Sequence, residues 1–446
     1  MRRVRYATVA VLALVATACA GVGPAPPGRS QTAARPVREV LPNGVVLIAH
    51  DHRASDVVAL QLWVRVGGRD EAPAELGLSH YLEHMLFKGT PTRPPGSIDA
   101  LIEGIGGTSN AFTSYDQTHY DVVVPVAQLR TAAELLADIA VNAAFVPEEL
   151  EAEKKVVFEE MNLVEDDPEK FLGRRLGELT YAGHPYGRAL LGTRELVRGL
   201  DRARLDAYYR KHYIPANMVL VVVGPVAPAE IRRVADATFG RLAGPAAAPR
   251  PAPPVRSLAG GRRADVPRPE QQAYLGLAWQ VAATNEPDVY ATDLLTYILG
   301  DGTSSRLNQR VREQLGLVAS IEASYVARER SGIVSVTARL DPPNLDRAEA
   351  ATLDVIRRVR AEGVTEVERQ RALITAESYY AFDIETAEGL AKTYGQAETT
   401  WTLEDELQYL TRLRQVSAAE IRAAALKYLA DDNYARVRFV PSGGRK

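Results

Sequence analysis

Cysteine is almost absent from this chain of 446 residues, in which Cys19 is the only one. One cysteine cannot form a disulfide within the chain, so disulfide bonds contribute nothing to the fold. Hydrophobic residues make up 46% of the sequence and charged residues 24%, which is typical of a soluble globular protein. The chain is too long for one ordinary hydrophobic core, and its length therefore predicts two domains.

Long apolar runs and a strong net charge are also absent. No internal segment holds 18 or more uninterrupted apolar residues, which excludes an internal membrane-spanning helix. The formal net charge of −3 excludes a broad electrostatic attraction to nucleic acid or to anionic lipid. We therefore expect no nucleic-acid partner, although a local basic patch is compatible with this charge.

The N-terminus has the composition of an export signal. Three arginines lie within the first five residues, and an apolar core at 7–18 ends in the motif ATAC at 16–19. We interpret residues 1–19 as a signal peptide of lipoprotein type, with Cys19 as the lipidated residue. An ordinary A-x-A cleavage site before a coincidental cysteine is the alternative, since leucine is more usual than Ala16. Either interpretation predicts export, and lipidation would anchor the protein to a membrane of the bacterial periplasm only through Cys19.

Two segments rich in Ala, Pro and Gly divide the rest of the chain. Residues 20–36 are predicted to be a flexible tether, and residues 241–261 a linker with nothing that could pack a core. The predicted domains are therefore 37–240 and 262–446.

The predicted elements follow a similar order in both domains. In the first domain, strands are predicted at 45–48, 57–64, 110–113, 120–124 and 218–223, and helices at 77–87, 127–143 and 147–163. The second domain repeats the series of strand, long helix, glycine turn, helix, two strands, helix pair and final strand. One trace survives in the residues themselves, since FVPE at 145–148 opens a helix much as GVTE does at 363–366. We predict an α+β protein of two homologous α/β-roll domains, each an antiparallel-dominated sheet packed with helices. Strands and helices alternate too irregularly for a doubly wound parallel sheet.

The most informative motif is His80-Tyr81-Leu82-Glu83-His84. Two histidines four residues apart on a helix lie on one face and can reach one metal ion. Glu83 lies beside that face, where a carboxylate can accept a proton from water. The parts are those of H-E-x-x-H in reverse order, two nitrogen ligands and a base. With seven histidines in the chain, chance alone would give this pattern on a core helix roughly one time in a hundred.

A catalytic zinc site has three protein ligands and one open position, so a third ligand is required. The remaining histidines lie in strand, turn or helix-end contexts that are poorly placed for this role, namely His50, His52, His119, His184 and His212. The acidic helix at 148–160 offers carboxylates instead.

Helical geometry separates the glutamates of that helix. Glu153, Val156, Val157 and Glu160 fall on one stripe, whereas Glu159 points about 100° away from it. Two carboxylates on an otherwise apolar stripe are costly unless they are paired or bind a metal. A solvated acidic face is the alternative, and it suits the other glutamates better than Glu160. We favour Glu160 as the third ligand and Glu153 as the residue that orients a ligand histidine.

These motifs resemble those of the zinc peptidase family that includes insulinase, pitrilysin and the mitochondrial processing peptidase. That family carries H-x-x-E-H followed by E-x6-E, which is found here as Glu153 to Glu160, and it shares the spacing of 76 residues from His84 to Glu160. Further matching segments are HYLEHMLFKGT at 80–90, SNAFT at 109–113, HPYG at 184–187 and YIPANMVLVVV at 213–223. The resemblance extends over about residues 37–440 and fits the short, two-domain branch.

The resemblance implies a function and the residues that carry it. One Zn²⁺ per chain would be held by His80, His84 and Glu160, and Glu83 would take a proton from the attacking water and pass it to the leaving amine. The segment Asn110-Ala111-Phe112 matches an edge strand that pairs with extended substrates by β-augmentation. For Phe112 alone, core packing is the alternative. The implied activity is zinc-dependent endopeptidase action on extended or unfolded peptides.

The chain departs from the family pattern in its second domain, where no metal site is expected. Complete members supply an arginine and, seven residues later, a tyrosine that hydrogen-bonds the scissile carbonyl. Arg312 matches the arginine and is an expected substrate contact, but seven residues later stands Ala319, and counting from Arg310 gives Leu317. Neither side chain donates a hydrogen bond, and loss of one such donor typically costs about 10²–10³ in turnover. Tyr325 lies further along, on a predicted strand, and we do not assign it this role.

We therefore hypothesise a zinc-bearing subunit of a heterodimer, whose homologous partner lacks zinc ligands and supplies the arginine and tyrosine. A homodimer is the other arrangement considered. The rival from another functional class is a non-enzymatic structural or scaffold subunit of the same fold, against which the intact ligands and base argue. A processing peptidase for one exported precursor would be chemically identical to a general peptidase.

Overall fold

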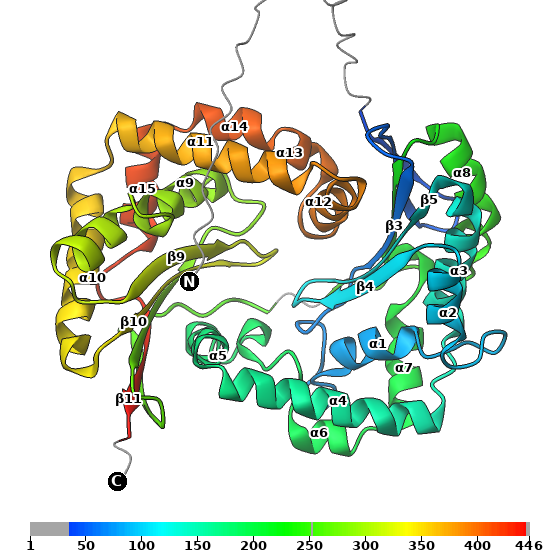
Figure 1. The fold of residues 1–446 in the computed structure, drawn as a ribbon, viewed down its shortest axis with the longest axis horizontal. Helices are drawn as coiled ribbons and strands as arrows, with labels where there is room; N and C mark the ends of the chain where they lie inside the picture. The colour runs from blue at the N-terminus through cyan, green and yellow to red at the C-terminus, as the bar shows by residue number, and fades with distance from the viewer. Residues whose placement is uncertain (1–34, 251–252, 443–446) are drawn as a thin grey trace, which may run out of the picture. The chain divides into compact units, whose positions relative to one another are not determined.

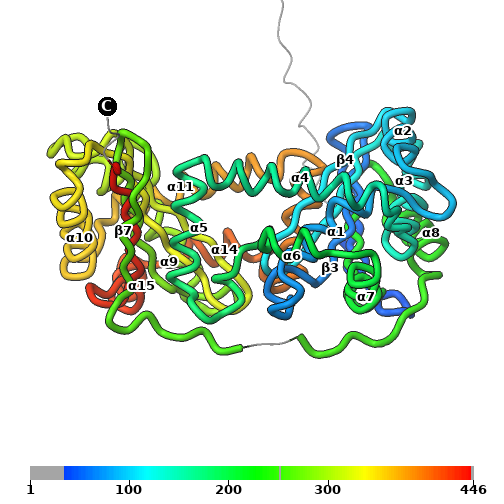
Figure 2. Tube along the Cα trace, turned by 90° about the horizontal axis from the view of Figure 1, so that it is seen from below, coloured from blue at the N-terminus to red at the C-terminus, as the bar shows by residue number. Residues whose placement is uncertain are grey.

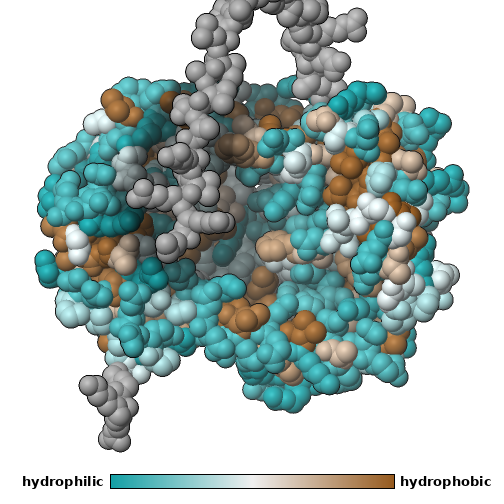
Figure 3. Space-filling model, in the orientation of Figure 1, coloured by the Kyte–Doolittle hydropathy of each residue, from teal (hydrophilic) through white to brown (hydrophobic). Residues whose placement is uncertain are grey.

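The computed structural model describes residues 35–250 and 253–442. The predicted signal peptide with Cys19, and the predicted tether up to residue 34, lie outside these residues, so lipidation and export stay predictions. No described helix is long and apolar enough to cross a membrane. The face drawn in Figure 3 is mostly hydrophilic, and its hydrophobic residues gather in several separate groups. Below, the N-terminal half is residues 35–240 and the C-terminal half is residues 262–442.

The N-terminal half is built on a six-stranded sheet. Its strands are β1 (Val37–Val40), β2 (Val46–Asp51), β3 (Val57–Val64), β4 (Thr108–Thr113), β5 (Thr118–Pro125) and β6 (Met218–Gly224). Their order in the sheet is β1-β2-β6-β3-β5-β4, and every pairing is antiparallel except that of β2 with β6. The helices are α1 (Leu78–Leu86), α2 (Ser97–Gly104), α3 (Leu129–Asn142), α4 (Pro147–Asp166), α5 (Pro168–Thr180), α6 (Arg194–Arg198), α7 (Arg202–His212) and α8 (Pro228–Ala237). Short 3-10 turns are η1 (Val126–Gln128), η2 (Pro185–Gly187), η3 (Pro215–Asn217) and η4 (Phe239–Arg241).

The C-terminal half is built on a five-stranded sheet. Its strands are β7 (Arg262–Arg268), β8 (Ala273–Val281), β9 (Ser320–Val326), β10 (Gly332–Leu340) and β11 (Ala435–Pro441). Their order is β7-β11-β8-β10-β9, with only β7 and β11 parallel. The helices are α9 (Val289–Gly300), the π-helix η5 (Asn308–Gln314), the 3-10 turn η6 (Pro342–Asn344), α10 (Leu345–Glu362), α11 (Glu366–Asp383), α12 (Ala387–Thr400), α13 (Leu403–Leu407), α14 (Tyr409–Gln415) and α15 (Ala418–Tyr428).

The two sheets have the same topology once β1 is set aside. In each, the last strand in sequence lies between the first and second strands, parallel to the first and antiparallel to the second. The fourth strand pairs with the second, and the third strand forms the free edge, which is β4 in one sheet and β9 in the other. The predicted α+β class with two antiparallel-dominated sheets is thus confirmed (Figure 1).

Corresponding helices also begin at the predicted positions. The FVPE segment opens α4, with Pro147 at its first position and Glu148 in the first turn, where its charge favours the helix dipole. The GVTE segment opens α11, where Thr365 and Glu368 form a capping box. These two starts place α4 and α11 at equivalent points of the two halves.

Each sheet is covered on one face by a helix from the opposite half. Helix α12, from the C-terminal half, packs on β3 and β6, and α5, from the N-terminal half, packs on β8 and β11. Both contacts need a glycine, because a Cβ at Gly395 would lie 2.0 Å from Nε1 of Trp63, and one at Gly276 would lie 2.6 Å from Cδ1 of Leu176. Each half therefore has a core of its own on one face of its sheet, and the other face is covered by a helix of the opposite half, which the predicted boundaries at 241–261 did not anticipate.

The predicted linker contributes to the packing. It contains no regular element between the end of η4 and the start of β7 among its described residues, and it runs as an extended segment (Figure 2). Leu258 is only 1% exposed and packs beside α5, so the expectation that nothing here could pack a core was wrong. Arg250 bonds to Asp70 from one half and Glu329 from the other. The described residues on both sides of 251–252 are thus held by paired charges and apolar contacts, although their composition predicts flexibility.

Candidate metal centre

Helix α1 carries the H-x-x-E-H motif and is fixed at its N-terminus by a buried carboxylate. Glu71 accepts hydrogen bonds from the backbone N–H of Gly77 (2.9 Å) and of Ser79 (2.8 Å). These are two of the unpaired donors at the start of a helix, where a negative charge is also favourable. Gly77 adopts φ 90°, and a Cβ there would lie 2.8 Å from the carbonyl oxygen of Leu191. The start of α1 is therefore set by the Glu71 side chain and by a backbone contact of Gly77, both of which lie outside the motif.

Three predicted ligands converge at one point between α1 and α4. Nε2 of His80 lies 3.4 Å from Oε2 of Glu160, and Nε2 of His84 lies 3.5 Å from the same oxygen. One donor atom from each residue lies within 4.8 Å of the other two. Figure 1 shows the two helices that carry them side by side, with β4 adjacent. The sequence-derived set of ligands is thus brought together.

The donor set suits a zinc ion. Two ligand atoms at about 2.0–2.1 Å from one tetrahedral zinc ion are separated by roughly 3.3–3.4 Å. The two separations from Glu160 are close to that value. Oε2 of Glu160 is buried and has no hydrogen-bond partner among the described residues, although its carboxylate is 36% exposed as a whole. Two imidazoles and one carboxylate, with a buried unpaired oxygen between them, fit one Zn²⁺.

Glu153, predicted to orient a ligand histidine, lies in hydrogen-bond contact with His84. Its Oε2 lies 2.9 Å from Nδ1 of His84, which leaves Nε2 of that ring directed at Glu160. Its other oxygen pairs with Nζ of Lys88 at 2.7 Å. Burial raises the pKa of Glu153, but the bonds to Lys88 and His84 outweigh it, so the pKa is lowered. Glu153 is thus held as an anion beside the ligand.

The two histidines differ in their electrostatic surroundings. Burial lowers the pKa of His80 to about 4, assisted by the neighbouring His84. Burial also lowers the pKa of His84, but the neighbouring carboxylates of Glu160 and Glu153 outweigh it and raise that pKa to about 9. The carboxylates around His84 therefore favour positive charge at this point of the site.

The predicted base, Glu83, lies on the same helix as the two histidines and is partly buried. Desolvation raises its pKa, while a hydrogen bond with the side chain of Thr113 lowers it to a smaller extent. Oε2 of Glu83 is buried and unpaired among the residues that the structure describes. An unpaired carboxylate oxygen with a raised pKa can both accept and return a proton. Thr113 ends β4, so the base is tied to the edge strand of the sheet.

That strand leaves one side of its backbone free. Among the described residues β4 pairs only with β5, and the predicted substrate contacts Asn110, Ala111 and Phe112 lie along it. Phe112 is 54% exposed, so the core-packing alternative for this residue was wrong. An exposed edge is open to a further strand.

The residues predicted from the C-terminal half are not part of this cluster. Arg312 lies in η5, is 43% exposed and forms its one ion pair within the described chain with Glu313. Ala319 is exposed just before β9, whereas Leu317 is buried. The hydroxyl of Tyr325 donates to the carbonyl of Ala282, which agrees with leaving this residue unassigned.

One step of the helix argument needs correction. Val156 is 44% exposed, so the predicted apolar stripe does not include it. The buried line of α4 instead runs through Leu150, Glu153, Val157 and Met161. This line turns slightly relative to the predicted stripe, and it places Glu160 beside the buried face rather than within it. A ligand at that edge can reach the metal position while the helix still packs.

Three contributing residues were not found from the sequence. Lys88 follows His84 by four residues, a spacing that could have indicated it. Thr113 belongs to the SNAFT segment, but nothing in that pattern pairs it with Glu83. Glu71 precedes α1 by more than the usual capping distance, so no local pattern would have shown its role.

Comparison with known proteins identifies the family. Residues 45–194 match the family described as insulinase, peptidase family M16, and residues 199–375 match the M16 inactive domain. A protein of Mycobacterium bovis named an uncharacterized zinc protease is 30% identical over 429 residues, covering 94% of this chain and 96% of the relative. A Bacillus subtilis protein, uncharacterized zinc protease YmxG, is 28% identical over 414 residues, covering 90% and 97%. The chain belongs to the insulinase family of peptidases, M16.

Solved structures share the fold. A protease from Helicobacter pylori has a TM-score of 0.86 at 22% identity, covering 91% of this chain and 99% of that one. The periplasmic protease PqqL from Escherichia coli has a TM-score of 0.76 at 20% identity, and the match covers 92% of this chain but only 48% of PqqL. The fold of this chain is therefore that of two-domain M16 peptidases, and PqqL is about twice as long as the matched part.

Proposed function

We propose that this chain is a zinc-dependent endopeptidase that hydrolyses extended or unfolded peptides. The observation that carries the proposal is the convergence of His80, His84 and Glu160 within 4.8 Å, with the unpaired carboxylate oxygen of Glu83 on the same helix. The names of the relatives as zinc proteases support the same activity.

The ligand residues and the base have separate tasks. A zinc ion held by three such ligands supplies a Lewis acid and makes water more acidic near neutral pH. Glu83 accepts the proton of the attacking water and delivers it to the leaving amine, and its raised pKa makes both transfers feasible. Glu153 keeps His84 in the orientation that presents Nε2.

Substrate would be positioned by β4. An extended peptide added to its free edge would form main-chain hydrogen bonds next to Asn110 and Phe112. Thr113 ends the same strand and contacts Glu83, so a peptide in register with β4 would be directed toward the base. Pairing through the backbone tolerates many sequences, which favours unfolded peptides as the substrate class.

We propose further that a second, homologous chain completes the active site. Ala319 and Leu317 offer no side-chain donor for a tetrahedral oxyanion, which supports the need for another source of an arginine and a tyrosine. A match that covers 48% of PqqL supports the idea that two such units can act together. The partner would carry the arginine and tyrosine and lack the zinc ligands, and a homodimer is the alternative assembly.

Export also remains a proposal. The N-terminal segment supports a lipid-anchored periplasmic protein with Cys19 as the modified residue, and the periplasmic location stated for PqqL is consistent with it. Mass spectrometry of the mature N-terminus tests this. A diacylglyceryl cysteine is expected, whereas a mature chain that starts at another residue would contradict it.

Metal content and hydrolysis separate the proposal from a scaffold role. The chain purified without chelator should contain about one zinc ion and hydrolyse an unfolded peptide only when its partner is added. Full activity of the isolated chain would remove the need for a partner. Absence of zinc together with unchanged assembly would favour the non-enzymatic subunit.

A further inference from the structure

The C-terminal half contains a recess at the position that corresponds to the metal centre. The metal centre lies between α1, α4 and the edge strand β4, and the corresponding elements of the other half are α9, α11 and β9. Residues from these three elements, together with α12, α13 and α14, line a cavity of about 380 Å³. In the register set by FVPE and GVTE, Glu160 corresponds to Ser378, next to the cavity residues Tyr379 and Tyr380.

Aromatic rings form much of the wall of this cavity. Six of its lining residues are aromatic, namely Tyr297, Tyr325, Tyr379, Tyr380, Trp401 and Tyr409. The rings of Tyr380 and Tyr409 stack at 5.7 Å, and those of Tyr297 and Tyr379 lie 5.9 Å apart. Ring faces attract cations, most strongly where water is excluded.

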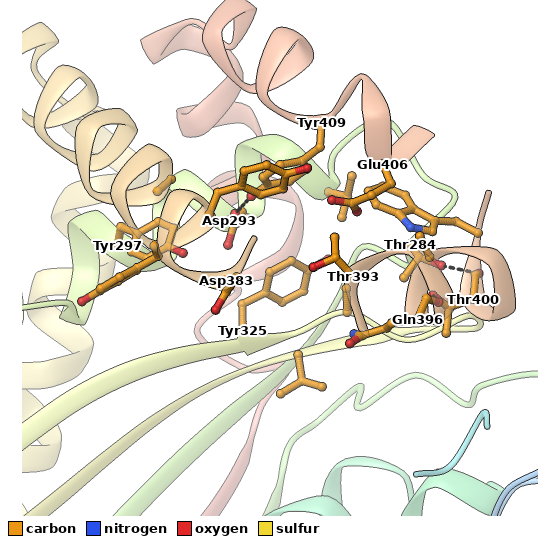
Figure 4. Close-up of a pocket in the computed structure, with 18 residues that line it drawn as sticks. Thr284, Asp293, Tyr297, Tyr325, Asp383, Thr393, Gln396, Thr400, Glu406 and Tyr409 are labelled. Atoms are coloured by element: carbon orange, nitrogen blue, oxygen red, sulfur yellow. Dashed lines mark hydrogen bonds between the residues drawn. The ribbon is translucent and has the colours of Figure 1, made fainter. Parts of the chain in front are cut away.

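Charge in the cavity has one sign. Asp293, Asp383 and Glu406 contribute carboxylates, and none of the lining residues is basic. Figure 4 shows these acids coming from α9, α11 and α13 around the same space, with Asp293 bonded to the hydroxyl of Tyr409. Burial raises the pKa of Asp293 to about 6 and that of Glu406 to about 7. A cation in the cavity would offset the cost of these buried charges.

The carboxylates do not form a metal site. Across the described residues, only His80, His84 and Glu160 bring three ligand atoms together closely enough for one ion. The acids of the cavity are spread around a space that suits a larger group, and the aromatic rings suit an organic cation better than a metal ion.

The cavity opens beside a free strand edge. Tyr325 and Val326 end β9, which within the described part of the chain pairs only with β10, and Ala327 follows them along the cavity wall. Val326 is also exposed to solvent. A peptide added to this edge could therefore place one side chain in the cavity.

We propose that this cavity binds the guanidinium or ammonium group of a peptide and so selects substrates that carry a basic residue. The substrate part of this proposal rests on the proposed peptidase function, whereas binding of the cation does not. The cavity is a counterpart of the metal recess in which aromatic and acidic side chains replace the metal ligands.

Binding is measured first, in the Glu83→Gln chain so that no peptide is cleaved. The probe is acetyl-Gly-Ser-Arg-Ser-Gly-amide, and the matched control has citrulline in place of arginine. Calorimetry gives the affinities, and the fluorescence of Trp401, one of three tryptophans, reports occupancy, with Trp401→Phe as its control. The arginine peptide should bind at least tenfold more tightly than the citrulline peptide. Equal affinities would overturn the proposal.

Variants then locate the binding. Glu406→Gln and the exposed Asp383→Asn should each weaken binding of the arginine peptide at least fivefold. Glu388→Gln, on α12 but outside the cavity, should change it less than twofold. Thermal unfolding checks that each variant is folded. If the variant of the buried residue, Glu406→Gln, does not fold, the exposed Asp383→Asn still tests the proposal. Equal effects of Asp383→Asn and Glu388→Gln would contradict the assignment.

A third peptide distinguishes the two sources of positive charge. It carries citrulline and a free N-terminal amine. Tight binding of this peptide alone would show that the cavity binds the N-terminal ammonium group of a chain. Tight binding of the arginine peptide alone would show that it binds a basic side chain. Both results support a cation site. Hydrolysis by the wild-type complex is a separate measurement, so cation binding without cleavage would refute the peptidase proposal while leaving the cavity assignment intact.

Discussion

Helices α1 and α9 occupy equivalent positions in the two halves, each following the second strand of the shared topology. The first carries His80, Glu83 and His84, whereas the second contributes Asp293 and Tyr297 to a cavity. The backbone frame is the same, so the difference lies in a few side chains. The shared topology provides two recesses, and their lining decides which one could hold a metal.

The halves differ in completeness as well. In the N-terminal half, ligands, base and edge strand are linked through Glu153 and Thr113. In the C-terminal half, no three ligand atoms converge among the described residues, and Ala319 precedes the edge strand. We infer that the chain pairs one chemical site with one recognition site.

Removal of a metal ligand should have the largest effect. Glu160→Gln should reduce bound zinc from about one ion per chain to less than a tenth, and lower peptide hydrolysis by roughly 10³-fold, because two imidazoles alone hold zinc weakly. Atomic absorption and a fluorescent peptide assay measure the two quantities. Glu159→Gln, the exposed neighbour, should change neither. Zinc retained in Glu160→Gln but lost in Asp293→Asn would reverse the comparison of the two halves.

The residue that orients His84 should matter less. Glu153→Gln should weaken zinc binding by about 10–100-fold, because the ring loses its anionic partner while all three ligands remain. Competition with a zinc chelator measures this change. Glu148→Gln, in the first turn of the same helix, provides the control. An unchanged zinc affinity in Glu153→Gln would show that packing alone orients His84.

The exchanged helices give a matched pair of stability tests. Gly395→Ala places a methyl group against the buried, rigid indole of Trp63, and overpacking should cost about 1–3 kcal/mol despite the better helix propensity of alanine. Gly276→Ala meets the aliphatic side chains of Leu176 and Leu172, which can shift more easily than an indole ring, and should cost less than Gly395→Ala, about 1 kcal/mol. Thermal or denaturant unfolding compares them. A larger loss in Gly276→Ala would mean that the α5 contact is the less adaptable one.

The acidic cavity should make stability depend on pH. Burial raises the pKa of Glu406 to about 7 from its ordinary value of 4.5, so its contribution to stability is complete below pH 4.5 and is lost as the pH rises through about 7. Glu406→Gln cannot ionise and should reduce the loss of unfolding free energy over this range by on the order of 1–2 kcal/mol, which thermal unfolding at a series of pH values measures. The exposed Glu404→Gln is the control. If the stability of Glu406→Gln depended on pH in the same way as that of the wild type, ionisation of Glu406 would not be the cause of the pH dependence.

Sequence patterns predicted those features of the fold that depend on neighbouring residues in the chain. The predicted strand at 57–64 coincides with β3, and the spacing of His80 and His84 defines one helix face. The position of Glu160 followed from helical geometry, although the stripe was drawn one residue too wide at Val156. Periodicity gives the direction of a side chain within a helix, but burial also depends on how the helix lies on its neighbours.

Contacts between distant segments were not accessible in this way. Glu71 caps α1 from outside the helix, and Thr113, at the end of β4, contacts Glu83 on the adjacent helix α1. The exchange of α5 and α12 depends on Gly276 and Gly395, which a propensity argument treats as weak points of a strand and a helix. The acidic cavity collects residues from several elements, and no motif marks them.

The most direct test is made on the chain isolated together with the homologous chain proposed as its partner. Zinc content and hydrolysis of an unfolded peptide are measured on the same sample. Wild type and Glu83→Gln should both contain about one zinc ion per chain, because Glu83 is not among the converging ligands. Hydrolysis should fall by at least about 10³-fold in Glu83→Gln. Equal hydrolysis by the two proteins, or wild type without zinc, would contradict the account.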